Sequence, residues 1–414
     1  GQRAEVIIAN PAGIQINGAG FINASTVTLT TGTPQYGALG SLDGYVVRGG
    51  TVGEEGTGLD LRGTDYGAFL ASAVTVNASV HGFPLKVATG ANQISADHNQ
   101  AAPTTGVGTA PAYALDVSAL GGMYANKITL VGTEAGLGVR NAGSIGASGA
   151  SGVGGAGELV LDHNGWLSNS GTIQATGSVQ VTAAGAISNN GTVYAHADTR
   201  LTSQGNISNT GLIAAQGNTS VQATGMGAQI SSAANAVLAA GLTPSGGTTQ
   251  NGNLTVSAAD TVALHGQVIA AGQASIQGTS ISLVGAQLSA HNANLHATAG
   301  EVDASRSTLS AQESLAVRTA HTLRTDGASL SAQQLQLSAA SLSNIGGEIL
   351  QTGTTDLNMG VLGDLDNRGG RIASNSTNLG LGAQTLNNTD GRIEHAGAGT
   401  LAITATTLEG ARGQ

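Results

Sequence analysis

A repeat of about 20 residues is the feature that most restricts how this chain can fold. Leu167-Ser-Asn-Ser-Gly-Thr-Ile173 returns 20 residues later as Ile187-Ser-Asn-Asn-Gly-Thr-Val193, and again as Ile207-Ser-Asn-Thr-Gly-Leu-Ile213. A unit this short cannot bury its hydrophobic residues alone, so it must stack on its neighbours. The repeat therefore predicts a solenoid, in which every unit contacts only the units before and after it.

Apolar and polar residues alternate inside each repeat, as where Val179 and Val181 flank Gln180. A period of two is typical of a strand that buries one face. Asn-Gly, Ser-Gly and Asp-Gly pairs separate the strands and favour tight turns. A leucine-rich horseshoe would need helix-forming runs, which the repeats lack. We predict an all-β fold: a right-handed parallel β-helix with about 20 residues per rung. Two segments, 92–113 and 241–253, are expected to be loops outside the helix.

Asparagines recur with the repeat and predict a ladder of stacked side chains. Near the end of the chain, Leu342, Leu365 and Leu386 are each followed two residues later by an asparagine. Stacked rungs place such residues above one another, where their amides can hydrogen-bond from rung to rung. The predicted ladder consists of Asn169, Asn189, Asn209, Asn344, Asn367 and Asn388.

The composition supports a narrow interior and excludes several classes of function. Only 2% of the 414 residues are aromatic and 65 are glycine, so small aliphatic side chains must form the core. The absence of cysteine excludes disulfides and thiolate metal sites. A net charge of -10 argues against nucleic acid and anionic membrane surfaces as partners. Because no apolar run reaches the ~20 residues of a spanning helix, we do not expect the chain to cross a membrane.

We predict no catalytic residue, no cofactor and no metal site. The histidines have no metal-ligand spacing: His291 and His296 are five residues apart, which puts them on opposite faces of a strand. The acidic residues that come closest to a cluster have arginines beside them, which favours solvated charge pairs over a catalytic or calcium site. These residues are Asp356, Asp364, Asp366, Arg368 and Arg371.

The N-terminal part contains a distinctive turn, Asn10-Pro11-Ala12-Gly13-Ile14. Proline presets one dihedral of such a turn, asparagine caps it, and glycine occupies a position where a side chain is unfavourable. With Val87-Ala-Thr-Gly-Ala-Asn-Gln93 and the segment 114–141, this turn resembles the secretion domain of two-partner secretion exoproteins. That family includes filamentous haemagglutinin and the stalks of contact-dependent growth-inhibition proteins. Its motif is Asn-Pro-Asn-Gly-Ile, from which this chain departs at Ala12.

The resemblance implies an organisation and a destination. Residues 1–145 would be the C-terminal part of a secretion domain, 146–157 a glycine-rich insertion, and 158–414 haemagglutinin-type repeats. Because the motif lies well inside the domain in this family, we expect the domain to begin before Gly1. The resemblance implies export through an outer-membrane two-partner secretion transporter, with Asn10, Pro11, Gly13 and Ile14 as the secretion motif. It also implies a secreted protein at a Gram-negative cell surface.

Three hypotheses for function follow. The first is a structural segment of a haemagglutinin-like adhesin that binds a host-cell or bacterial surface receptor. The second is the stalk of a contact-dependent growth-inhibition toxin. The third, a β-helical polysaccharide lyase, is disfavoured because no carboxylates converge with Arg or Lys.

Overall fold

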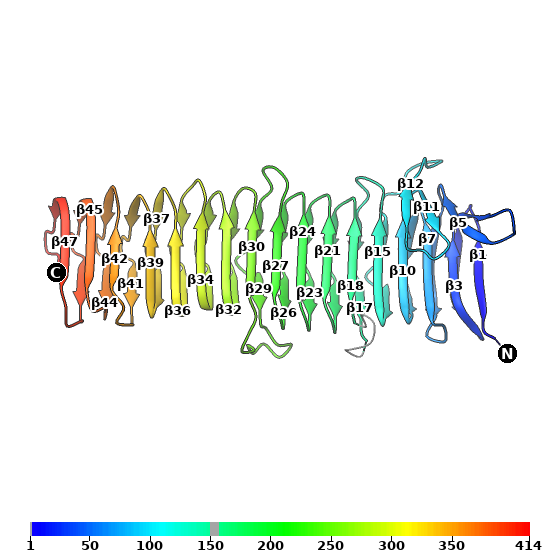
Figure 1. The fold of residues 1–414 in the computed structure, drawn as a ribbon, viewed down its shortest axis with the longest axis horizontal. Coiled ribbons are helices and arrows are strands. Elements are labelled where there is room, and N and C mark those ends of the chain that lie inside the picture. Colours follow the sequence, from blue (N-terminus) through cyan, green and yellow to red (C-terminus); the bar gives the residue numbers. More distant parts are fainter. Residues whose placement is uncertain (1, 150–156) are drawn as a thin grey trace. The chain divides into compact units, whose positions relative to one another are not determined.

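The computed structural model describes residues 2–149 and 157–414, and all its regular elements there are strands. The chain divides into two compact units, Gly1–Gly205 and Asn206–Gln414. In each unit, the strands of the main sheet pair in parallel with their counterparts one turn later and form a parallel β-solenoid (Figure 1). The predicted fold class is therefore confirmed.

The first unit has three faces of stacked strands. The first face contains β1 (Ala4–Ala9), β3 (Ala24–Thr30), β7 (Tyr66–Ala71), β10 (Pro84–Thr89), β15 (Lys127–Gly132), β18 (Leu159–His163), β21 (Val179–Ala183) and β24 (Thr199–Ser203). The second contains β2 (Ile14–Gly20), β6 (Thr51–Asp60), β8 (Ala73–Val76), β13 (Leu115–Val117), β16 (Val139–Asn141), β19 (Leu167–Asn169) and β22 (Ile187–Asn189). The third contains β9 (Ser79–His81), β14 (Gly122–Ala125), β17 (Ser144–Ala147), β20 (Thr172–Ala175) and β23 (Thr192–Ala195).

The second unit repeats this plan. Its first face contains β27 (Thr219–Ala223), β30 (Leu254–Ala258), β39 (Gln334–Ser338), β42 (Leu357–Gly360), β45 (Leu379–Asn387) and β47 (Leu401–Glu409). Its second contains β25 (Ile207–Asn209), β28 (Ile230–Ser232), β31 (Val262–Leu264), β33 (Ile281–Ser282), β35 (Val302–Asp303), β37 (Thr322–Arg324), β40 (Ser341–Ser343) and β43 (Asp364–Asp366). Its third contains β26 (Leu212–Ala215), β29 (Val237–Ala240), β38 (Ser329–Ala332), β41 (Glu348–Gln351), β44 (Arg371–Ser374) and β46 (Arg392–His395). Three long strands, β32 (Gln267–Gly278), β34 (Gln287–Ala297) and β36 (Thr308–Arg318), pass from the third face to the first.

The core of each solenoid is a stack of aliphatic side chains, as the alternating pattern predicts. Val179 and Val181 are fully buried, whereas Gln180 between them is exposed. In-register stacking puts like residues in contact on successive rungs about 4.8 Å apart. Each aliphatic residue is therefore buried mainly by its counterparts in the neighbouring repeats.

An antiparallel sheet beside the solenoid of the first unit corrects the prediction of a loop at 92–113. That segment supplies β11 (Asn92–Ser95) and β12 (Ala101–Pro103), which join β4 (Thr33–Tyr36) and β5 (Leu42–Val47) in the order β12-β11-β5-β4. Its apolar side chains pack against β7 and β10 of the solenoid. The β5 partner of β11 precedes it by about 50 residues, so local sequence could not reveal that pairing.

The other two irregular segments are placed as follows. Within 241–253, the structure has only an isolated antiparallel bridge between Leu242 and Thr248. The predicted glycine-rich insertion at 146–157 overlaps the end of β17, which extends to Ala147. Residues 150–156 of that insertion lie outside the described residues. Among the described residues, no helix is long and apolar enough to cross a membrane.

Candidate functional sites

The predicted secretion motif forms the turn between β1 and β2. Asn10 Oδ1 accepts a hydrogen bond from the backbone N–H of Ala12 at 3.1 Å, and the Gly13 N–H donates to the Asn10 carbonyl at 3.0 Å. Gly13 has φ 126°, and a Cβ there would lie 3.2 Å from the carbonyl oxygen of Thr51. The turn therefore requires glycine at this position for both its backbone conformation and its close approach to β6.

An open cleft of about 560 Å³ lies beside this turn. Pro11 and Ala12 line one part of it, and the ends of β4 and β5 line another. Arg48, which follows β5, is exposed and also lines the cleft. The motif and the antiparallel sheet thus share one accessible surface.

The structure brings two of the predicted ladder asparagines together with a third that the prediction omitted. Asn141 Nδ2 donates to Asn169 Oδ1, and Asn169 Nδ2 donates to Asn189 Oδ1, each at 2.7 Å. All three side chains are buried. We call Asn141, Asn169 and Asn189 the first ladder. Asn141 could have been found from the sequence, since Val139-Arg-Asn-Ala-Gly-Ser-Ile145 has the repeat pattern.

A second ladder lies in the second unit. Asn344 Nδ2 donates to Asn367 Oδ1, and Asn367 Nδ2 donates to Asn388 Oδ1, each at 2.7 Å. Thr325 Oγ1 donates to Asn344 Oδ1 at 2.8 Å and so precedes the asparagines as a cap. We call Thr325, Asn344, Asn367 and Asn388 the second ladder. Sequence reasoning missed Thr325 because it is not an asparagine.

Asn209, the remaining predicted ladder residue, lies on β25 in the second unit. Its Nδ2 donates to the carbonyl of Val237 at 3.2 Å, and its Oδ1 accepts from the N–H of Gly211 at 3.2 Å. The residue that pairs with it on the following rung is Ser232. The side-chain amides therefore do not continue onto that rung. That the ladders stabilise the solenoid stays a prediction.

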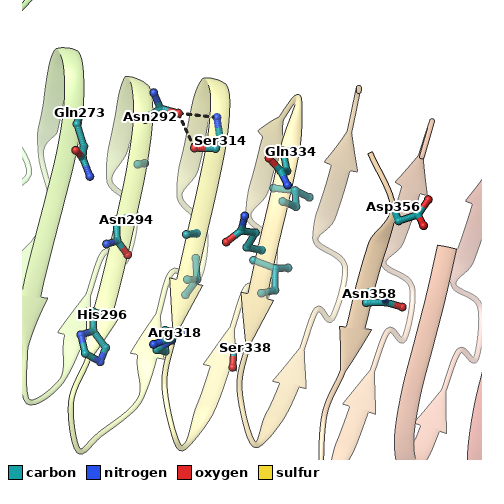
Figure 2. Close-up of a pocket in the computed structure, with 16 residues that line it drawn as sticks. Gln273, Asn292, Asn294, His296, Ser314, Arg318, Gln334, Ser338, Asp356 and Asn358 are labelled. Atoms are coloured by element: carbon teal, nitrogen blue, oxygen red, sulfur yellow. Dashed lines mark hydrogen bonds between the residues drawn. The ribbon is translucent and has the colours of Figure 1, made fainter. Parts of the chain in front are cut away.

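A polar trough of about 630 Å³ lies on the first face of the second unit (Figure 2). Residues from β32, β34, β36, β39 and β42 line it together with Asp356, and half of the lining side chains are amides or hydroxyls. Asn292 Oδ1 accepts hydrogen bonds from the backbone N–H and the hydroxyl of Ser314. His296 and Arg318 lie on adjacent rungs in this trough. Its surface offers hydrogen bonds to water or to a polar ligand.

The trough has little resemblance to a lyase site. Asp356 is the one carboxylate among its lining residues, and the Asn378 amide and backbone N–H bond to it at 2.9–3.1 Å. Acid–base cleavage of a glycosidic bond needs a second ionisable group poised beside the first. Asp356 therefore has the surroundings of a structural turn residue.

Asp364 and Asp366, the acidic residues near Asp356 in the sequence, are the first and last residues of β43. Asp366 pairs with Arg368 at 2.7 Å, while Arg371 pairs with Glu348 and Glu394 on the neighbouring rungs. All five groups are at least partly exposed to solvent. Within the described ranges, 2–149 and 157–414, no group of three or more His, Asp and Glu side chains is arranged to hold a metal.

Comparison with family models identifies two kinds of module. The TPS secretion domain model matches residues 1–161. The haemagglutinin repeat model matches residues 152–211 and 350–408.

Curated proteins align with most of the chain. Toxin CdiA of Yersinia pestis is 40% identical over 373 residues, covering 90% of this chain and 11% of that protein. The 16S rRNA endonuclease CdiA of Enterobacter cloacae subsp. cloacae is 34% identical over 368 residues, covering 87% of this chain and 11% of that protein. This chain thus spans about a tenth of the length of these relatives.

One solved structure is also similar, the crystal structure of the filamentous hemagglutinin secretion domain. It covers 67% of each chain at 25% identity, with a TM-score of 0.33. The secretion-domain match, the haemagglutinin repeats and the long alignments with CdiA proteins agree with one another. The chain belongs to the two-partner secretion exoproteins of the filamentous haemagglutinin and CdiA type.

Proposed function

We propose that this chain is a segment of a secreted surface protein in which a secretion domain leads into a structural stalk. The observation that carries the proposal is the continuity of the solenoid in the first unit. There β15, inside the secretion-domain match, pairs with β18, which pairs with β21 in the haemagglutinin repeats. The secretion domain and the haemagglutinin repeats therefore share one continuous stack of strands in the first unit. Residues 1–145 serve as the C-terminal part of the secretion domain and 158–414 as the repeats.

The partner for export is an outer-membrane two-partner secretion transporter. The secretion-domain match and the Asn10-Pro11-Ala12-Gly13-Ile14 turn support this assignment. The protein is displayed at the surface of a Gram-negative cell, where a host-cell or bacterial receptor is its second partner. The residues that contact such a receptor lie elsewhere in the protein or on the loops, and this segment supplies length without catalysis.

The relatives favour toxin delivery over adhesion as the role of the stalk. Those that align with about 90% of the chain are named as a toxin and an endonuclease. An adhesin stalk has the same architecture, so the distinction depends on the whole protein. Sequencing the intact native polypeptide to its C-terminus decides between them. A compact domain at the C-terminus, together with killing of neighbouring cells in a competition assay, supports toxin delivery. Repeats that continue to the C-terminus support adhesion.

Export is tested with the full-length protein in cells that contain its transporter. Gly13→Ala forces a side chain into the secretion turn, where φ is positive and Thr51 is close. We expect the protein at the cell surface to fall severalfold. Gly346→Ala is the matched control, because Gly346 also has positive φ (62°) but lies in the repeats with open space around its Cα. Equal surface levels of the two variants and the parent would contradict the role of the turn in export.

A further inference from the structure

A carboxyl group is buried without a partner inside the secretion-domain part of the solenoid. Glu54 of β6 has no exposed surface, and neither of its carboxylate oxygens has a hydrogen-bond partner. Its neighbours in register are Ile16 on one side and Val76 on the other. An ionised carboxylate in such surroundings is strongly unfavourable, and the usual response is to bind a proton.

The position of Glu54 in the strand stack is informative. Val76 pairs with Val117, Val117 with Asn141, and Asn141 with Asn169. Glu54 therefore occupies the same interior column as the first ladder. The asparagines in that column have amide partners on adjacent rungs, whereas Glu54 has an aliphatic residue on both sides. The column offers no donor to a charged form of Glu54.

The titratable groups on the strands around β6 do not relieve this burial. Neither β2 nor β8 has a titratable side chain. On β6 itself, Glu55 points outward and Asp60 bonds to Arg62. On β9 the His81 ring stacks on Tyr124 outside the solenoid, and on β7 the Tyr66 hydroxyl bonds to His98. Burial alone raises the pKa of Glu54 from its ordinary value of 4.5 to about 8.

We propose that the rungs formed by β2, β6 and β8 fold by taking up one proton from solvent at Glu54, which makes this part of the secretion domain a pH-sensitive element. The proton binds one carboxylate oxygen, and the neutral acid is buried in the aliphatic column. Unfolding exposes the group and returns the proton to solvent. The inference goes beyond the proposed function, because it concerns the folding equilibrium of the chain itself.

The direction of the pH dependence follows from linkage. Between the unfolded pKa of 4.5 and the folded pKa of about 8, the folded state holds one more proton than the unfolded state. Stability is therefore fully present below about pH 4.5 and is lost as pH rises toward 8. Over this window, the opening equilibrium constant of these rungs rises about tenfold per pH unit.

Amide hydrogen exchange of the whole purified chain measures the opening equilibrium of individual rungs, after correction for the intrinsic pH dependence of exchange. Peptides covering β2, β6 and β8 should lose protection between pH 5 and 8, relative to peptides from β19 and β22 in the first ladder. Glu54→Gln, which cannot ionise, should remove the pH dependence. Glu55→Gln is the matched control, since it removes the adjacent exposed charge and should leave the wild-type profile unchanged.

A second variant keeps the experiment decisive if Gln is poorly tolerated. Glu54→Leu replaces the acid with an apolar side chain that suits the column, and protection should then be high and independent of pH. Equal pH profiles for the wild type and both Glu54 variants would overturn the proposal, as would constant wild-type protection across the window. Export in cells is measured separately, so failure of the secretion proposal would not be mistaken for failure of this one.

Discussion

The two asparagine ladders have the same geometry between rungs but begin differently. In the second ladder, the Thr325 hydroxyl donates to the first amide oxygen, that of Asn344. In the first ladder, the residue on the rung before Asn141 is Val117, and the buried Oδ1 of Asn141 has no partner. In each ladder, the Nδ2 of one asparagine donates to the Oδ1 of the asparagine on the next rung. The Oδ1 of the first asparagine therefore has a donor only if the preceding rung supplies a hydroxyl or an amide.

The difference shows that stacking alone does not complete a ladder. A buried acceptor without a partner costs about 1–3 kcal/mol relative to a satisfied one. The first ladder has this cost at Asn141, because the residue before it in the column, Val117, is aliphatic. The second ladder avoids it with a single hydroxyl. The comparison therefore predicts opposite effects for substitutions at the two beginnings.

The largest effect is expected from a charge inside a ladder. Asn367→Asp removes the N–H that donates to Asn388 Oδ1. It puts a carboxylate oxygen in the place of Nδ2, which lies 2.7 Å from that Oδ1, so two acceptor oxygens face each other. We expect a loss of roughly 3–5 kcal/mol of unfolding free energy at pH 7, because the new carboxylate is buried without a counter-charge. The loss should shrink as pH falls from 7 to about 4, because burial raises the pKa of the new acid and the folded state takes up the proton first. Urea denaturation at the two pH values measures both quantities.

The control for that substitution is Asn358→Asp on the exposed trough face. There the charge stays in water, so the change should lie within about 0.5 kcal/mol. Similar losses for the two variants would mean that the ladder amides are no more sensitive to charge than surface amides.

An intermediate effect is expected from removing the cap of the second ladder. Thr325→Val keeps the side-chain shape but leaves Asn344 Oδ1 as unsatisfied as Asn141 Oδ1 is now. We expect a loss of about 1–3 kcal/mol by urea denaturation. Thr404→Val, at an exposed position of β47, should be nearly neutral. A neutral Thr325→Val would show that the cap does not distinguish the two ladders.

The smallest effect is the reverse substitution in the first ladder. Val117→Thr places a hydroxyl one rung before Asn141, where it can donate to the unpaired Oδ1. We expect a gain of up to about 1 kcal/mol. Val74→Thr, at a buried position of β8 between Val52 and Leu115, has only aliphatic side chains beside it on the two neighbouring rungs and should instead lose stability. If both variants are destabilised alike, the Asn141 oxygen is already satisfied by other means.

Much of the architecture could be predicted because the repeat acts through nearest neighbours. A 20-residue period with alternating Val, Ile and Leu predicts strands that stack in register, and the recurring asparagines then fall in one column. The glycine at position 13 was predictable for the same local reason, since the turn itself demands its conformation. These features depend only on residues close in sequence or one repeat apart.

The remaining features depend on which residues meet across irregular spacings. In the segment 92–113, β11 pairs with β5 of a hairpin about 50 residues earlier, and β12 pairs with β11. The pairing with β5 is long-range, so no local pattern predicts that the segment joins a sheet. The adjacent residues Glu54 and Glu55 look alike in the sequence. Only the register of β6 against β2 and β8 decides that Glu54 points into the core.

The sequence by itself therefore determined the solenoid and the asparagine columns, because a regular period repeats the same neighbours on every rung. The tertiary structure decided how each column begins and ends. Thr325 beside Asn344, Val117 beside Asn141, and Glu54 between two aliphatic residues are set by the rungs where the period is interrupted. At those rungs the free energy of a buried polar group depends on a single neighbour that only the three-dimensional register supplies.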